Sequence, residues 1–140
     1  MSIQKILSLE GAIASCRNEI ARIEETINDQ IEIKGKIYDV DLQVIEFHTA
    51  RESELFTVCE IPQKVRAMEN ICANLDSAIN GTSYETAKQM IENMLTKIDN
   101  KIQELERKKE DKYSEIATYS AQIESIKQEL KKIEEAQNDT

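Results

Sequence analysis

The feature that most constrains the fold of this 140-residue chain is a set of apolar residues spaced in alternating steps of three and four. Near the N-terminus the pattern consists of Ile6, Leu9, Ile13, Cys16, Ile20, Ile23 and Ile27. Nearer the C-terminus it is longer and has lysine at two positions: Ile91, Leu95, Ile98, Ile102, Leu105, Lys109, Lys112, Ile116, Tyr119, Ile123, Ile126, Leu130 and Ile133. This is the a/d pattern of a coiled coil, because residues at these steps share one face of a helix and not one face of a strand.

Few residues interrupt the helical pattern, and they divide the chain into three predicted helices. Pro62 suits only the first turn of a helix, so we expect one helix over 3–57 and a short one over 62–79. Asn80 and Gly81 offer a left-handed residue to end the short helix, and a third helix is expected over 83–136. Three glycines and one proline are too few for a many-stranded sheet. The sequence therefore predicts an all-α protein: a long antiparallel coiled-coil helical hairpin with a short third helix at the tip, in a single domain over 1–140.

The two long helices have nearly equal length, which suggests that Ile6 faces Ile133 in the hairpin. This alignment places Ile27 opposite Lys112 and makes the polar interruptions of both helices meet in one layer, formed by Gln30, Lys34, Lys109 and Lys112. Such a layer could bind an anion or another ligand within the hairpin. The favoured interpretation is a polar layer that fixes the register of the coiled coil.

After residue 27 the apolar pattern changes phase, which predicts a stutter in the first helix. Ile31, Tyr38, Leu42 and Ile45 fit a new register, and Gly35 weakens the helix there, so a bend is expected. Apolar residues outside the first seam could form a second stripe for a partner protein. The candidates for that role are Ile3, Ile31, Ile33, Ile37, Val40 and Val44.

The sequence shows little that resembles catalytic or metal-binding chemistry. His48 is the only histidine, and one histidine without a nearby nucleophile favours a surface or packing role. The three cysteines read as reduced thiols: Cys16 lies on the seam, whereas Cys59 and Cys72 flank Pro62 and could approach each other at the tip. We therefore expect no enzyme activity, no metal and no cofactor.

Charge and hydropathy also exclude several kinds of partner. The net charge of -9 would repel nucleic acid and anionic membrane surfaces over most of the protein. No run of apolar residues is long enough to span a membrane, and no basic-then-apolar leader occurs at the N-terminus. These features predict a cytoplasmic protein.

The segment from Leu75 to Lys88 resembles the W-x-G or L-x-G turn of small helical-hairpin and LXG-domain proteins of Gram-positive type VII secretion. Here the motif is Ile79-Asn80-Gly81, with Ile79 in the place of the family's Trp and Tyr84 at the start of the next helix. The layout is similar to the small α-helical proteins encoded beside LXG toxins. The resemblance implies a targeting factor that binds the helical N-terminal LXG domain of a toxin, or a second small helical protein, and that could leave the cell with it without a signal peptide.

The expected function is thus that of a non-enzymatic helical partner protein, and a homodimer is also possible. Two alternatives stay open. One is a structural or prefoldin-like coiled-coil chaperone or scaffold, which would need a β-hairpin between the helices and has only Leu55–Ile61 as a possible strand. The other is a parallel homodimer of extended chains.

Overall fold

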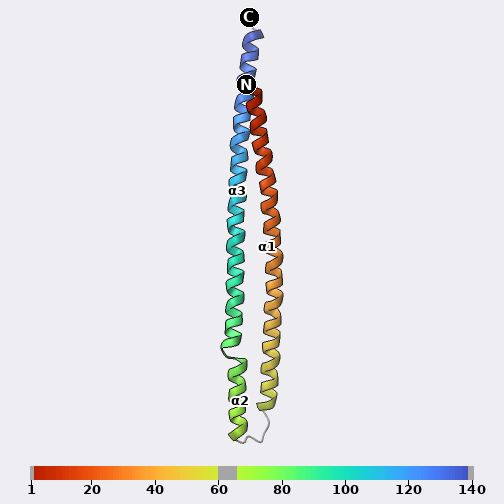
Figure 1. Cartoon of the computed structure of the whole chain (residues 1–140), viewed down its shortest axis with the longest axis vertical. Helices are drawn as coiled ribbons and strands as arrows, with labels where there is room; N and C mark the ends of the chain where they lie inside the picture. The colour runs from red at the N-terminus through yellow and green to blue at the C-terminus, as the bar shows by residue number, and fades with distance from the viewer. Residues whose placement is uncertain (1, 60–65, 139–140) are drawn as a thin grey trace. The chain divides into compact units, whose positions relative to one another are not determined.

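The computed structural model describes the backbone of residues 2–59 and 66–138, and the side chains of 2–56 and 69–138. It contains the three helices α1 (Ser2–Cys59), α2 (Arg66–Ile79) and α3 (Thr82–Asn138) (Figure 1). The predicted all-α hairpin with a short third helix is confirmed. Pro62, where the sequence predicts the second helix to begin, lies outside the described residues. Leu55, the start of the possible strand, belongs to α1.

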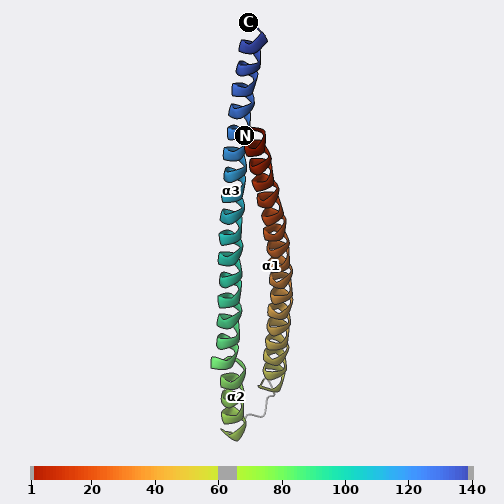
Figure 2. The ribbon, with the colours of Figure 1, turned by 45° about the horizontal axis from the view of Figure 1, so that its top comes forward.

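Contacts divide the chain into two units, one formed by Met1–Asp29 with Lys101–Thr140 and the other by Gln30–Asn100. We call them the terminal unit and the central unit and describe each by itself. In the terminal unit, the first half of α1 lies antiparallel beside the second half of α3 (Figures 1 and 2). Its core is formed by seam residues: Ile13, Cys16, Ile20, Ile27, Leu105 and Ile123 are all less than a tenth exposed. Burial of each such aliphatic side chain stabilises the pair by about 1.5–3 kcal/mol.

The register of the terminal unit differs from the predicted one. Lys112 Nζ lies 2.8 Å from a carboxylate oxygen of Glu19, and Cys16 Sγ lies 3.4 Å from Glu115. Continuing that antiparallel alignment along α1 brings Ile27 level with Leu105, which is also buried. The predicted pairing of Ile27 with Lys112 is therefore wrong by one heptad.

The shifted register also explains why Ile133 is not part of the core. The end of α3 extends past the start of α1 (Figure 2), and Ile133 is 56% exposed. The predicted contact between Ile6 and Ile133 is therefore wrong, because in this alignment α1 has no residue opposite Ile133. Ile6 is half-buried.

In the central unit, α1 lies beside the first part of α3 and beside α2 (Figures 1 and 2). The half-buried residues of α1 that face α3 continue the original three-and-four spacing: Gln30, Lys34, Ile37, Asp41, Val44 and His48. The residues that the predicted stutter would have turned inward are all exposed: Ile31, Tyr38, Leu42 and Ile45. The stutter prediction is therefore wrong. Polar residues occupy this part of the seam because they find charged partners there, as Lys34 does with Asp99 at 2.6 Å.

The junction of α2 and α3 depends on Gly81 for a different reason than predicted. No glycine in the described part of the chain has a positive φ, so the expected left-handed residue is absent from the described turn. Instead, a Cβ on Gly81 would lie 2.1 Å from the carbonyl oxygen of Ser77. The turn therefore needs glycine because the backbone of α2 passes too close for any side chain. Asn80 continues the α2 hydrogen bonding by donating its N–H to the carbonyl of Asp76 at 2.8 Å.

Candidate functional site

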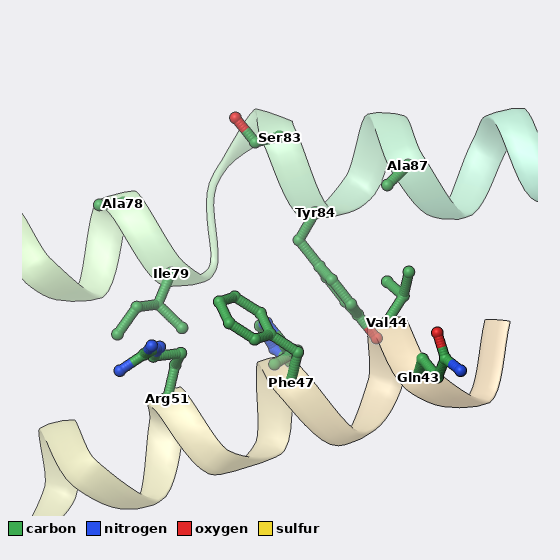
Figure 3. Close-up of a pocket in the computed structure, with 10 residues that line it drawn as sticks. Gln43, Val44, Phe47, Arg51, Ala78, Ile79, Ser83, Tyr84 and Ala87 are labelled. Atoms are coloured by element: carbon green, nitrogen blue, oxygen red, sulfur yellow. The ribbon is translucent and has the colours of Figure 1, made fainter. Parts of the chain in front are cut away.

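A pocket of about 620 Å³ lies in the central unit where α1 meets the junction of α2 and α3 (Figure 3). Most of its lining is apolar. Figure 3 shows Tyr84 reaching from α3 to α1 near Val44, while Ile79 extends from α2 toward Arg51. The motif residues Ile79 and Tyr84 thus both line the pocket, whereas Asn80 points away to donate its side-chain amide to Asp76 at 2.7 Å.

The centre of this pocket is a stacked pair of rings, His48 and Tyr84. Their centroids are 3.7 Å apart and their planes differ by 10°. The packing role predicted for His48 is what the structure shows. The sequence does not predict the contact of His48 with Tyr84, because the contact requires the correct register of the two helices.

The basic groups at this pocket are already engaged by neighbouring side chains. His48 Nε2 lies 3.2 Å from Glu52 Oε1, and Arg51 Nη1 lies 2.7 Å from Glu54 Oε2. The Arg51 guanidinium also sits 4.9 Å from the centroid of the Phe47 ring. Among the described residues, no buried side-chain nitrogen or oxygen lacks a hydrogen-bond partner. The pocket therefore has the character of a packing junction.

Three residues of the predicted polar layer, Lys34, Lys109 and Lys112, have carboxylate partners within their own unit. In the central unit Lys34 pairs with Asp99, and Gln30 is half-buried on the α1 seam. In the terminal unit Lys112 pairs with Glu19, while Lys109 Nζ lies 3.3 Å from Glu106 on its own helix. The polar layer and the anion site that these four residues could form stay predictions.

Two lysine–aspartate pairs lie at the seam of the central unit. Lys34 Nζ lies 2.6 Å from Asp99, and Lys88 Nζ lies 2.6 Å from Asp41. The hydrogen bond to each aspartate is the main cause that raises the pKa of each lysine above its usual range. Because each pair joins α1 to α3 at one level, the two pairs fix the register. The sequence prediction contains neither Asp41 nor Asp99. An acidic residue at a seam position, as Asp41 is, could have indicated an ion pair with the facing helix.

A charged cluster surrounds the buried thiol of the terminal unit. Lys112 lies between Glu19 and Glu115, at 2.8 Å and 3.1 Å, and Cys16 Sγ donates to Glu115. The hydrogen bond to Glu19, followed by that to Glu115, raises the pKa of Lys112, while Lys112 lowers the pKa of Glu115. Burial raises the pKa of the Cys16 thiol. Since the thiolate is the nucleophile, this environment makes Cys16 an inert seam residue.

The cysteines differ from one another in redox state. Cys16 is a free thiol, as predicted, whereas Cys72 on α2 is disulfide-bonded. The expectation of a reduced thiol is therefore wrong for Cys72. The side chain of Cys59, which the sequence predicts could approach Cys72 at the tip, lies outside the described residues.

α1 carries a series of exposed apolar side chains in the central unit. Between residues 31 and 47, seven large apolar side chains are at least about a third exposed: Ile31, Ile33, Tyr38, Val40, Leu42, Ile45 and Phe47. Three of the partner-binding candidates, Ile31, Ile33 and Val40, are among them. Ile37 and Val44 are instead half-buried against α3, so their assignment to an open stripe is wrong. Ile3, in the terminal unit, is exposed.

The described residues lack two other kinds of site. No group of three or more His, Cys, Asp or Glu residues there could hold a metal ion. No described helix is both long and apolar enough to cross a membrane. Comparison of the chain with protein-family models, with curated proteins and with solved structures finds no match.

Proposed function

We propose that this chain is a non-enzymatic partner protein that binds another helical protein along residues 31–47 of α1. The observation that carries the proposal is the number of large apolar side chains that this segment leaves exposed. Its seam toward α3 mixes polar and apolar residues, Lys34, Asp41 and His48 with Ile37 and Val44, whereas its exposed faces carry seven large apolar residues. A helix with this pattern has more apolar surface than one neighbouring helix can cover.

The contrast with the terminal unit supports a specific role for this segment. There the apolar residues of α1 from Ile13 to Ile27 face α3 and are mostly buried. Full burial of a large apolar side chain contributes about 1.5–3 kcal/mol, so covering even some of the seven exposed residues would stabilise a complex substantially. Ile31, Tyr38, Leu42 and Ile45 lie on one flank of α1, and Ile33, Val40 and Phe47 lie on the other. Exposed apolar surface on a folded protein commonly marks interaction sites.

The resemblance of Ile79-Asn80-Gly81 and its surroundings to the turn of LXG-associated proteins supports the identity of the partner. In this proposal the partner is the helical N-terminal LXG domain of a type VII secreted toxin, and the complex assists export of that toxin. The chain acts inside the cell, or leaves it together with the toxin. Its role is to cover the helices of the LXG domain and to hold them in alignment.

Co-expression of the full chain with an LXG-type N-terminal domain encoded beside it tests the proposal. We expect the two proteins to elute together in size-exclusion chromatography, with a light-scattering mass equal to that of a complex. The toxin domain that follows the LXG domain serves as the control and should not co-elute. Elution of the chain as a separate monomer in the presence of the LXG domain would contradict the proposal.

A further inference from the structure

The exposed apolar residues of the central unit form a second helix-packing seam on α1. The positions are Ile31, Gly35, Tyr38, Leu42 and Ile45, and their steps are four, three, four and three. The four side chains are exposed, and a Cβ on Gly35 would meet nothing within 4 Å. This second seam has the spacing that another helix needs for knobs-into-holes packing, and Gly35 allows close approach of a backbone.

An acidic row borders the second seam on α1 itself. Glu32, Asp39 and Glu46 each follow a seam residue by one position, so they repeat every seven residues along one edge. All three are exposed. Lys36 Nζ lies 3.7 Å from Glu32 Oε1 on the same helix.

A second acidic row borders the seam from α3. Glu85, Glu92 and Asp99 are exposed and also repeat every seven residues. The ammonium of Lys34 shows that this row and the seam lie on one side of the hairpin, because it is 2.6 Å from Asp99 and 5.9 Å from the centroid of the Tyr38 ring. The second seam therefore runs between two rows of carboxylates.

The other exposed apolar residues of α1 between positions 31 and 47 lack this arrangement. Ile33, Val40 and Phe47 are spaced by seven, and the polar residues Lys36 and Gln43 lie between them on the helix surface. The residues that would complete steps of four and three on this flank, Ile37 and Val44, are half-buried toward α3. The flank therefore exposes one apolar residue per heptad and not the paired a and d positions of a helix-packing seam. The two flanks of α1 are thus distinguishable in both spacing and charge.

We propose that the second seam docks one helix of another protein, with an apolar stripe at steps of three and four that is edged on both sides by lysine or arginine. The inference rests on the proposed function, since it names the docking site and the chemistry of the partner. A second copy of this chain carries the same two acidic rows. Isologous pairing through the seam would oppose carboxylates, which disfavours a homodimer there.

The test uses two synthetic helical peptides with leucine at positions a and d. One has lysine at every e and g position, and the other has glutamate. Binding to the full chain is measured by fluorescence anisotropy. We expect the lysine peptide to bind at least about tenfold more tightly than the glutamate peptide, because like charges across an interface suppress binding. Its affinity should fall as salt is added, since the facing charges are exposed.

Matched variants locate the site. Ile31→Lys and Ile33→Lys make the same change two positions apart, on opposite flanks of α1. We expect Ile31→Lys to weaken binding of the lysine peptide at least about tenfold and Ile33→Lys by less than about threefold, because only Ile31 lies on the seam. Gly35→Leu should also weaken binding by filling the space that the peptide backbone approaches. Gly11→Leu, at another open helical glycine, should leave binding unchanged. Circular dichroism of each variant checks that its helices are intact.

Three outcomes would overturn the inference: equal binding of the two peptides, equal effects of Ile31→Lys and Ile33→Lys, or a dimer of the free chain that Ile31→Lys dissociates. The last would identify a second copy as the occupant. Failure of the inference can be separated from failure of the proposed function. If the LXG domain co-elutes with the chain but its binding is weakened by Ile33→Lys and not by Ile31→Lys, the proposed function holds and the seam is the wrong site.

Discussion

The rings of His48 on α1 and Tyr84 on α3 stack at 3.7 Å, with their planes only 10° apart. The pair lies at the level where α2 ends and α3 begins, next to Ile79 and the close backbone approach at Gly81. A residue of the turn region and a seam residue of the opposite helix thus meet. This contact ties the conformation of the turn to the register of the hairpin in the central unit.

Removing one ring should destabilise the protein measurably. We expect His48→Ala to lower the free energy of unfolding by about 0.5–1.5 kcal/mol, the usual contribution of a stacked aromatic pair beyond its buried area. Urea unfolding followed by circular dichroism measures the change. Thr49→Ala, at an exposed neighbouring position, is the control and should unfold close to the unmodified chain. Equal midpoints for the two variants would show that the stack contributes nothing.

The register of the terminal unit can be checked with pairs of engineered cysteines in a cysteine-free background. Ile27→Cys combined with Leu105→Cys should form a disulfide on mild oxidation, because the two positions are level and buried. Ile27→Cys combined with Lys112→Cys should not, since a shift of seven residues moves the thiol by about 10 Å along the helix. Non-reducing electrophoresis distinguishes the cross-linked chain. Faster oxidation of the second pair would contradict this register and support the one predicted from the sequence.

Substitution of the glycines should have opposite effects at different positions. Gly81→Ala should destabilise the protein by about 1–3 kcal/mol, because its Cβ would collide with the backbone of Ser77 and the turn must shift. Gly11→Ala should stabilise it by about 0.5–1 kcal/mol, since alanine favours the helix and its Cβ has open space. Thermal unfolding of the two variants in parallel measures the loss of stability at Gly81 and the gain of stability at Gly11. A stabilising Gly81→Ala would contradict the close approach seen at the turn.

The cluster around Lys112 predicts a loss of stability in acid. The pKa of Glu115 is lowered in the folded protein from its ordinary value of 4.5, mainly by the hydrogen bond to Lys112. The unfolded chain therefore takes up this proton at a higher pH than the folded chain does. The stabilisation by Glu115 is complete above about pH 4.5 and is lost as the pH falls through the lowered value.

Urea unfolding at a series of acidic pH values tests this dependence. Glu115→Gln should lose less stability on acidification than the unmodified chain. It lacks the carboxylate that causes part of the slope of the unfolding free energy against pH. Glu110→Gln, at an exposed position on the same helix, is the matched control and should keep the slope of the unmodified chain. If all three proteins show the same slope, the Glu115–Lys112 pair does not contribute to the acid sensitivity.

The sequence was a good guide to the helices and a poor guide to their alignment. The apolar positions from Ile91 to Leu130 predicted the face of α3 that packs, and lysines at Lys109 and Lys112 did not disturb it. The alignment failed because it assumed that polar interruptions meet each other. In the structure Lys112 instead meets Glu19, which lies beside the seam and not on it.

The candidate site shows the same difference between what the sequence predicts and what only the tertiary structure shows. The sequence predicts a second register at Ile31, Tyr38, Leu42 and Ile45, and a stutter would turn these residues toward α3, but in the structure they are exposed. An apolar stripe indicates only that a face of the helix can be buried. It does not indicate which neighbour buries that face, so the exposure of these residues is known only from the positions of the other helices.

By itself, the amino-acid sequence determined the three helices, the antiparallel hairpin and the face of each long helix that carries apolar residues, because helical periodicity is a local property. The tertiary structure decided the register, the His48–Tyr84 stack and the outward direction of the second seam. Rows of isoleucine and leucine pack almost equally well after a shift of one heptad. Pairs such as Lys34 with Asp99 and Lys88 with Asp41 form in one alignment and not in the shifted one, since each requires two specific atoms to meet.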